Sequence, residues 1–281
     1  CNFNMSGETV FSGEEIDRYS KIILDPKYRT GVDRNLWIWE EYHPTSTYMI
    51  SADVARGDGR DYSVFHVFKL ETMELVAEYQ GKVTPDVFSR VLYDTGNEYG
   101  QCLVVVENNS VGFAVLEKLR DLRYSNIYYS IKSTHEFVEE HVAENMSNAV
   151  AGFTNSTKTR PLIIAKMEEF VRNNIIKIYS SRLLSEMKTF IWNNGKAEAM
   201  RSYNDDLVMA CAIGCWVRDT ALVANKRDSE YKKAFLASTV LTSTQLDTRI
   251  PGMIGRKDLK LQESMVKQKK DQQQYSWLYK G

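Results

Sequence analysis

The sequence predicts an α/β protein built on a mixed β-sheet, with an antiparallel three-stranded start, a parallel extension and helices on its flanks. Three observations support this fold class. Three apolar segments follow one another between residues 48 and 81 with short turns between them, as in consecutive antiparallel strands. The segment "CLVVVENN" (102–109) is continuously apolar and lies between two helical patterns, as expected of a parallel strand buried on both faces. The order β-β-β-α-β-α-β requires a crossover before this strand.

The first three strands are expected over 48–54, 62–70 and 74–81. The first two are joined by "RGDGRD", in which Gly57 and Gly59 allow a tight turn. These strands provide the antiparallel start of the sheet.

A helix is then expected within "TPDVFSRVLYDTGNEYG" (84–100), where Thr84 is a suitable N-cap and Pro85 suits the first helical position. A second helix (111–122) and a further strand (126–132) complete the predicted order.

The second half of the chain is predicted to be mainly helical. Residues 133–158 are rich in Ser, Thr, Asn and Glu and are expected to form a mobile loop. Amphipathic helices are predicted at 160–173 and 181–193. Short strands are expected at "IKIY" and "KAEAM", followed by an apolar helix within "NDDLVMACAIGCWVRD" (204–219).

These patterns divide the chain into three parts: an irregular lead-in or linker (1–47), a main domain (48–225) and a basic, partly extended tail (226–281). The chain begins with Cys1 rather than Met, which suggests a fragment of a longer polypeptide.

Composition indicates a soluble globular protein, because 43% of the 281 residues are hydrophobic and 26% are charged. No apolar run reaches the roughly 18 residues of a membrane span, and no signal peptide heads the sequence. The four cysteines form no CxxC pair and no zinc-site spacing, which favours a reduced, intracellular setting.

The net charge of −1 is unevenly distributed along the chain. Residues 51–110 carry ten acidic and five basic side chains, whereas 156–201 carry four and nine, and 226–281 carry six and twelve. An acidic centre flanked by basic segments suits a metal site that meets a polyanion, although solvated helix faces would explain the same imbalance.

Acidic residues stand where the core should continue. Asp53 ends the first predicted strand, Glu107 ends the strand at 102–109, and Asp205 and Asp206 begin the last apolar helix. If the two strands are neighbours and the helix packs across their ends, three carboxylates meet, and they can be ionised together at low cost only around a cation. Oxygen ligands of this kind suit Mg²⁺ or Mn²⁺, and two such ions would support phosphodiester hydrolysis.

Several of these acids also have simpler roles available. Asp205 or Asp206 could serve only as a helix N-cap, and Asp58 and Asp61 could be turn residues. A hairpin could instead fold Asp61 back beside Asp53.

The two adjacent aspartates differ by about 100° around a helix axis, so only one of them should point into a shared site. Asp206 shares a face with Met209 and Ala210, on the side predicted to be packed. We therefore expect Asp206 to be the ligand, and Asp205 to cap the helix or face solvent.

The stretches "SADVARGDGRDYSVFHVF", "VVVENN" and "NDDLVMA" together resemble the C-terminal nuclease domain of the large terminase subunits of tailed bacteriophages. That domain has the RNase H-like fold, and the resemblance covers about residues 30–225. It implies a metal-dependent endonuclease that cuts concatemeric double-stranded DNA during viral genome packaging, with low sequence specificity.

The resemblance implies that Asp53, Glu107 and Asp206 bind two Mg²⁺ or Mn²⁺ ions and act in catalysis, with Asp205 and Asp61 as lesser candidates. The implied partners are double-stranded DNA, the portal ring, the small terminase subunit and an upstream ATPase domain of the same polypeptide, and no membrane. No GxxxxGK[ST] motif is present, so no ATPase motor is expected in this chain. The implied location is the cytoplasm of the infected host cell, at the procapsid portal and not as a stable virion component.

Other functions remain open at the level of sequence. Another RNase H-like nuclease, of the junction resolvase or transposase type, would share the carboxylates. An actin-like ATPase also places an Asp before a glycine turn, but "NDDLVMA" lacks the glycine that a second phosphate loop would need. A non-catalytic portal-docking module is the alternative that is not an enzyme.

Overall fold

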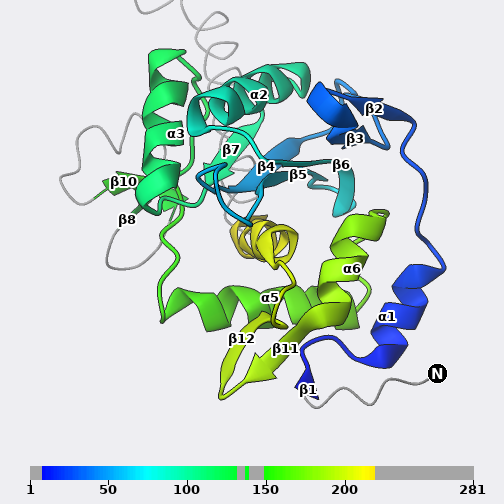
Figure 1. Cartoon of the computed structure of the whole chain (residues 1–281). Helices are drawn as coiled ribbons and strands as arrows, with labels where there is room; N and C mark the ends of the chain where they lie inside the picture. Colours follow the sequence, from blue (N-terminus) through cyan, green and yellow to red (C-terminus); the bar gives the residue numbers. More distant parts are fainter. Residues whose placement is uncertain (1–7, 132–136, 139–148, 219–281) are drawn as a thin grey trace, which may run out of the picture. The chain divides into compact units, whose positions relative to one another are not determined.

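The computed structural model describes residues 8–131, 137–138 and 149–218, all of which belong to one compact unit. A six-stranded mixed sheet lies at the centre of this unit (Figure 1). Its strands are, in spatial order, β2 (Tyr28–Thr30), β3 (Leu36–Ile38), β6 (Glu74–Gly81), β5 (Ser63–Lys69), β4 (Tyr48–Asp53) and β7 (Leu103–Val106). Neighbouring strands are antiparallel except for β4 and β7, which are parallel. The predicted antiparallel start and parallel extension are confirmed.

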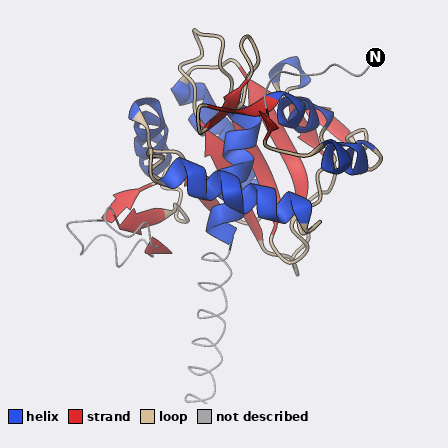
Figure 2. Ribbon diagram, turned by 90° about the horizontal axis from the view of Figure 1, so that it is seen from below, coloured by secondary structure: helices blue, strands red, loops and turns tan. Residues whose placement is uncertain are grey.

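Helices cover both faces of this sheet (Figures 1 and 2). Strand residues alternate between two apolar clusters, since successive side chains point to opposite faces. One face packs against α2 (Pro85–Glu98) and α3 (Ser110–Asp121). The other packs against α5 (Thr159–Arg172), α6 (Ser181–Thr189) and a helix that begins at residue 206 and continues to 218, the last described residue. We call this last element the 206–218 helix.

The 206–218 helix lies directly on β5 because it carries a glycine at the contact. A Cβ atom added to Gly214 would lie 2.3 Å from the ring of Phe68. A side chain at this position would therefore force the helix away from the sheet.

Residues 8–47 are more ordered than the sequence predicts, because β2 and β3 extend the central sheet and α1 (Gly13–Ser20) packs on α6. A capping box starts α1: Ser12 Oγ accepts from the Glu15 amide, and the Glu15 carboxylate accepts from the Ser12 amide. The expectation of an irregular lead-in is wrong for these described residues.

The helix predicted over 181–193 ends at Thr189, and β11 (Phe190–Asn193) follows without a loop. Strand β11 pairs with β1 (Glu8–Thr9) and with β12 (Lys196–Ala199). The two residues that join β11 to β12 have positive φ angles, 49° at Asn194 and 78° at Gly195, as a tight hairpin turn requires. This Asn-Gly pair indicates a β-hairpin, but the helical apolar spacing before it led to the prediction of a longer helix.

The strand predicted over 126–132 is divided between two sheets. Ile127 alone makes a parallel bridge to Val104 of the central sheet. A separate antiparallel sheet then forms from β8 (Tyr129–Ile131), β9 (Phe137–Val138) and β10 (Ala149–Ala151). The prediction of a loop over 133–158 is therefore wrong at β9 and β10, while 132–136, 139–148 and the tail (226–281) lie outside the described residues.

The remaining short strands have different outcomes. The predicted "IKIY" strand is reduced to one bridge between Lys177 and Glu74, whereas "KAEAM" corresponds to β12. Among the described residues, no helix has both the length and the apolar character needed to cross a membrane.

Candidate active site

Two of the predicted acids lie side by side at the ends of neighbouring strands. Ala52 of β4 is in register with Val106 of β7, so Asp53 and Glu107 are the next residues on each strand. The Glu107 amide donates a hydrogen bond to the Ala52 carbonyl, 3.0 Å away, which continues the parallel pairing to this point. Because side chains alternate along strands, Asp53 points to the same face as Ser51, the face covered by the 206–218 helix.

Asp206, the first residue of the 206–218 helix, brings a third carboxylate to this edge. Its Oδ2 atom accepts hydrogen bonds from the Tyr62 amide at 2.9 Å and from Asn204 Nδ2 at 3.0 Å. The loop that follows β4 and the residues that precede the helix thus fix the orientation of this carboxylate.

The electrostatics show that Asp53 feels both neighbouring carboxylates. Burial raises the pKa of Asp53 well above its usual range, and the neighbouring Glu107 and Asp206 carboxylates raise it further. Burial also raises the pKa of Asp206, to which the charges of Asp61 and Asp205 contribute. Ionised Glu107 and Asp206 therefore make ionisation of Asp53 more costly, unless a cation compensates the charges.

Asp205 has a different partner. Its Oδ2 atom lies 2.7 Å from Nη2 of Arg160, at the start of α5, and the same guanidinium donates to the Ala197 carbonyl of β12 at 3.3 Å. Asp205 therefore ties the start of the helix to α5 and β12. Asp205 occupies the expected N-cap position, since its carbonyl accepts from the Met209 amide at 2.8 Å, but its side chain makes this half-buried ion pair instead of capping the helix.

The cap of the 206–218 helix comes from another element. Oε2 of Glu186, on α6, accepts hydrogen bonds from the amides of Leu207 at 2.8 Å and Val208 at 3.1 Å. These are the amides that an N-cap side chain normally binds. Burial raises the pKa of Glu186 to about 9, although the two amide hydrogen bonds lower it.

A row of buried polar side chains crosses the sheet beneath the same helix. Ser51, His66 and Glu78 are paired across β4, β5 and β6. The Ser51 hydroxyl donates to the Ala210 carbonyl at 2.7 Å, and Nε2 of His66 lies 3.0 Å from the Leu207 carbonyl. Burial lowers the pKa of His66, which favours the neutral ring.

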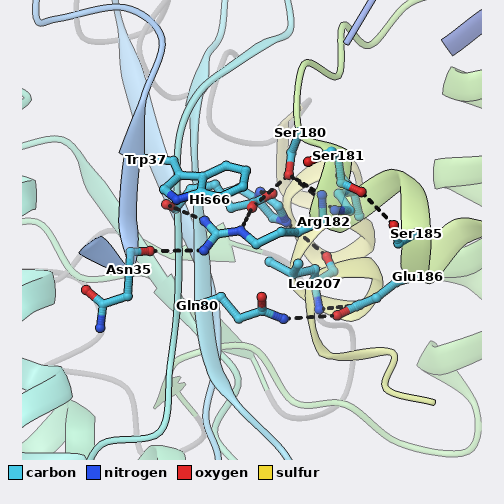
Figure 3. Close-up of polar contacts among 12 residues, drawn as sticks. Asn35, Trp37, His66, Gln80, Ser180, Ser181, Arg182, Ser185, Glu186 and Leu207 are labelled. Atoms are coloured by element: carbon cyan, nitrogen blue, oxygen red, sulfur yellow. Dashed lines mark hydrogen bonds and ion pairs between the residues drawn. The ribbon is translucent and has the colours of Figure 1, made fainter. Parts of the chain in front are cut away.

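Glu78 anchors the far end of this row to the start of α6, where Ser180 and Arg182 lie (Figure 3). Its Oε1 atom accepts from Nε of Arg182 at 2.7 Å and from the Ser180 hydroxyl at 2.8 Å. The Arg182 guanidinium also stacks on Trp37, 3.8 Å from the ring centroid.

Sequence patterns did not identify Glu186 or the polar row, and only weak signals pointed to them. Glu186 is a charged residue on the buried side of α6, next to Met187 and three residues after Leu183. His66 interrupts an otherwise apolar strand in the same way.

Exposed basic side chains border the carboxylates. Arg56 and Arg60 lie on the loop between β4 and β5, and the Arg60 carbonyl accepts a hydrogen bond from Asn204. Lys82, also exposed, places its Nζ atom 4.8 Å from the ring centroid of Tyr62. The loop whose Tyr62 amide binds Asp206 therefore carries two exposed arginines and is contacted by an exposed lysine.

The tight turn at the start of this loop depends on Gly57. Its φ angle is 85°, and a Cβ atom there would lie 2.4 Å from the Val83 carbonyl oxygen. The glycine thus lets the loop pack closely against the residues after β6.

The carboxylates at this edge fit an ion such as Mg²⁺, which keeps some of its waters, better than a metal ion held entirely by protein ligands. Within the described residues, no three His, Cys, Asp or Glu side chains are close enough to hold a metal ion as they stand. Mg²⁺ usually keeps several waters and takes only one or two carboxylates from the protein. The neighbouring Asp53 and Glu107 meet that requirement, and Asp206 lies near enough to raise the pKa of Asp53.

Comparisons with known proteins agree with the motifs. No family model matches the chain. A large terminase subunit of Thermus virus P23-45 is 27% identical over 220 residues, which cover 76% of this chain and 39% of that protein. The chain thus spans about two fifths of the length of this curated relative.

Solved structures agree as well. The large terminase nuclease of thermophilic phage G20c, with bound magnesium, superposes with a TM-score of 0.56 at 21% identity, covering 75% of this chain and 97% of that one. The large terminase nuclease domain of Thermus phage P74-26 gives a TM-score of 0.53 at 21% identity, covering 73% and 93%. The resemblance drawn from the motifs is confirmed, and the described chain has the RNase H-like fold of the nuclease domain of large terminase subunits.

Proposed function

We propose that this chain is a metal-dependent DNA endonuclease of a viral genome-packaging terminase, which cuts concatemeric double-stranded DNA with low sequence specificity. The observation that carries the proposal is the side-by-side placement of Asp53 and Glu107 at the ends of paired strands, with Asp206 near enough to raise the pKa of Asp53. The likeness to terminase nucleases supports the choice of substrate.

Asp53, Glu107 and Asp206 are proposed to hold two divalent cations, Mg²⁺ or Mn²⁺. The related G20c nuclease has been solved with bound magnesium and with bound cobalt, which supports a site for divalent metals here. When bound, such ions would supply an activated water and stabilise the leaving oxygen of the phosphodiester.

The protein's own contribution is to hold the carboxylates in place. Asp53 and Glu107 are fixed by the backbone pairing of β4 and β7. The Tyr62 amide and Asn204 orient the Asp206 carboxylate from the other side. Asp61 is exposed, and its charge reaches Asp206, so we propose an accessory role for it. Asp205 is proposed to act only through its ion pair with Arg160.

The basic side chains that border the site are suited to bind the DNA backbone. Arg56 and Arg60 are exposed on the loop between β4 and β5, Lys82 is exposed over Tyr62 of the same loop, and the segment 156–201 carries a net charge of +5. Contacts of this kind position a duplex without recognising its sequence, which agrees with low specificity.

The wider assembly follows from the resemblance alone. We propose an upstream ATPase domain, the portal ring and the small terminase subunit as partners, with packaging in the cytoplasm of the infected host cell.

Incubation with supercoiled plasmid and Mg²⁺ or Mn²⁺, with and without chelator, tests this function. We expect nicked and linear products that require the metal and show no fixed cut site. A four-way junction substrate is the matched comparison, since a junction resolvase would cut it in preference to plasmid. Full cutting in the presence of chelator would contradict a metal-dependent nuclease.

A further inference from the structure

The first turn of the 206–218 helix is held by side chains from outside the helix. Its adjacent aspartates are engaged elsewhere: Asp205 with Arg160, and Asp206 with the Tyr62 amide. Glu186 instead accepts the amides of the following two residues through a single oxygen, Oε2 (Figure 3).

The carbonyl groups of the same segment are fixed from the sheet. Nε2 of His66 lies 3.0 Å from the Leu207 carbonyl, and Ser51 donates to the Ala210 carbonyl at 2.7 Å. His66 and Ser51 are neighbours across β5 and β4, and β4 is the strand that ends in Asp53. These hydrogen bonds therefore fix the start of the helix relative to β4, the strand that supplies the Asp53 carboxylate of the proposed site.

This registration matters because a helix can place Asp206 correctly in only one rotational setting. Advancing the helix by one residue turns a side chain by about 100° and shifts it by about 1.5 Å along the axis. Glu186 binds the residue directly after Asp206, so it acts on both the rotation and the position of that residue. Glu186 is itself 8% exposed and receives a hydrogen bond from Gln80 Nε2 at 3.4 Å, which places its carboxylate within the packed interior.

We propose that Glu186 is a positioning residue for Asp206: it caps the 206–218 helix from α6 and thereby sets the carboxylate where a divalent cation can bind it. This inference rests on the proposed metal-dependent function. Glu186 does not need its negative charge for this role, because one acceptor oxygen receives both amides.

The variants that separate position from charge are Glu186→Ala, which removes the acceptor, and Glu186→Gln, which keeps an acceptor oxygen without charge. Glu186→Asp keeps the carboxyl group but withdraws the acceptor by one methylene. Ser12→Ala is the matched control, since it removes the side-chain cap of α1, a helix that contributes no carboxylate to the site. All variants are made in the full 281-residue chain.

The first measurement is amide hydrogen exchange in the metal-free protein. Exchange at Leu207 and Val208 should accelerate in Glu186→Ala and Glu186→Asp, and stay close to wild type in Glu186→Gln and Ser12→Ala. The second is Mn²⁺ binding by titration calorimetry on folded protein. Loss of an outer-shell partner typically weakens metal binding by roughly 10- to 100-fold, and we expect the lower part of that range for Glu186→Ala.

Glu186→Gln should recover near wild-type Mn²⁺ binding, whereas Ser12→Ala should lose thermal stability without a change in Mn²⁺ affinity. Wild-type Mn²⁺ affinity in folded Glu186→Ala would overturn the inference while leaving the proposed function intact. The same conclusion follows if Glu186→Gln loses as much Mn²⁺ affinity as Glu186→Ala. If Glu186→Ala does not fold, the inference is tested by comparing the Mn²⁺ affinities of Glu186→Gln and Glu186→Asp: only the second should be weakened. A wild-type chain that neither binds Mn²⁺ nor cuts DNA would contradict the proposed function itself, and the inference with it.

Discussion

The Asp205 carboxylate and the Arg160 guanidinium lie 2.7 Å apart, and this pairing separates the roles of two adjacent aspartates. Asp205 is committed to α5, while Asp206 accepts the Tyr62 amide and lies within the electrostatic reach of Asp53. Of the two adjacent aspartates at the start of this helix, only Asp206 is thus available to the proposed metal site.

We expect Asp206→Asn to eliminate Mn²⁺-dependent plasmid cleavage and Asp205→Asn only to weaken it. The loss of the Arg160 ion pair should instead cost about 1 kcal/mol of unfolding free energy, the upper end of the range for ion pairs that water can reach. Arg160→Gln is the matched control and should resemble Asp205→Asn in both cleavage and denaturant unfolding. The reverse ranking of the two aspartates at saturating Mn²⁺ would show that Asp205 is the ligand.

Asp53→Ala and Glu107→Ala should each reduce cleavage to the level seen with chelator while leaving the fold intact. Because Glu107 raises the cost of ionising Asp53 in the folded state, either change should slightly stabilise the metal-free protein. Plasmid assays and circular dichroism melting curves test both statements. Asp58→Ala, an exposed acid in the same loop region, is the control that should still cut. An unfolded Asp53→Ala protein, or one with full activity, would contradict this prediction.

Stability should depend on pH through Glu186, whose pKa burial raises to about 9. A raised carboxyl pKa means that the folded state binds more protons than the unfolded chain, so this contribution to stability is lost as pH rises from about 4.5 to about 9. The slope from one group is at most about 1.4 kcal/mol per pH unit. Glu186→Gln removes the titrating group, and its unfolding free energy relative to wild type should therefore rise across this range. Parallel curves for the two proteins would show that Glu186 does not titrate in this range.

Lys82→Gln should weaken DNA binding and reduce its salt dependence. Its ammonium group stands over the ring of Tyr62, whose amide binds the Asp206 carboxylate, and we expect it to contact a phosphate of bound DNA. Loss of one phosphate contact lowers the slope of log K against log salt by about 1. Fluorescence anisotropy over a salt series measures this slope, and Lys27→Gln is the control, because that exposed lysine precedes β2 at the opposite edge of the sheet. Equal slopes for Lys82→Gln and wild type would exclude Lys82 as a phosphate contact.

The central sheet could be predicted from sequence because its signals are local. The alternation in β4 and β5, the Gly57 turn and the apolar β7 each carry their own pattern, and acids at strand ends are visible in a single segment. The connection between α6 and β11 could not be predicted in the same way, since the apolar residues at 187, 190 and 191 continue the helical spacing of α6 into the strand.

The outer parts of the site depended on contacts between distant residues, which no single segment reveals. Glu186 lies 21 positions before the Leu207 amide that it binds, and Arg160 lies 45 positions before Asp205. The extension of the sheet by β3 likewise depends on its pairing with β6, so a short strand such as Leu36–Ile38 has too little sequence to identify it alone.

The three proposed ligands come from early, middle and late positions in the described chain, at residues 53, 107 and 206. During translation, β4 and β7 are therefore made well before Asp206, the residue that would complete the proposed metal site. A ribosome-bound chain that ends before residue 206 carries Asp53 and Glu107 without the third carboxylate. Contacts between residues so far apart form late, because loop closure must precede them. We expect a newly made nuclease to stay unable to cut DNA until the 206–218 helix has docked on the sheet, which would protect nearby nucleic acid during translation.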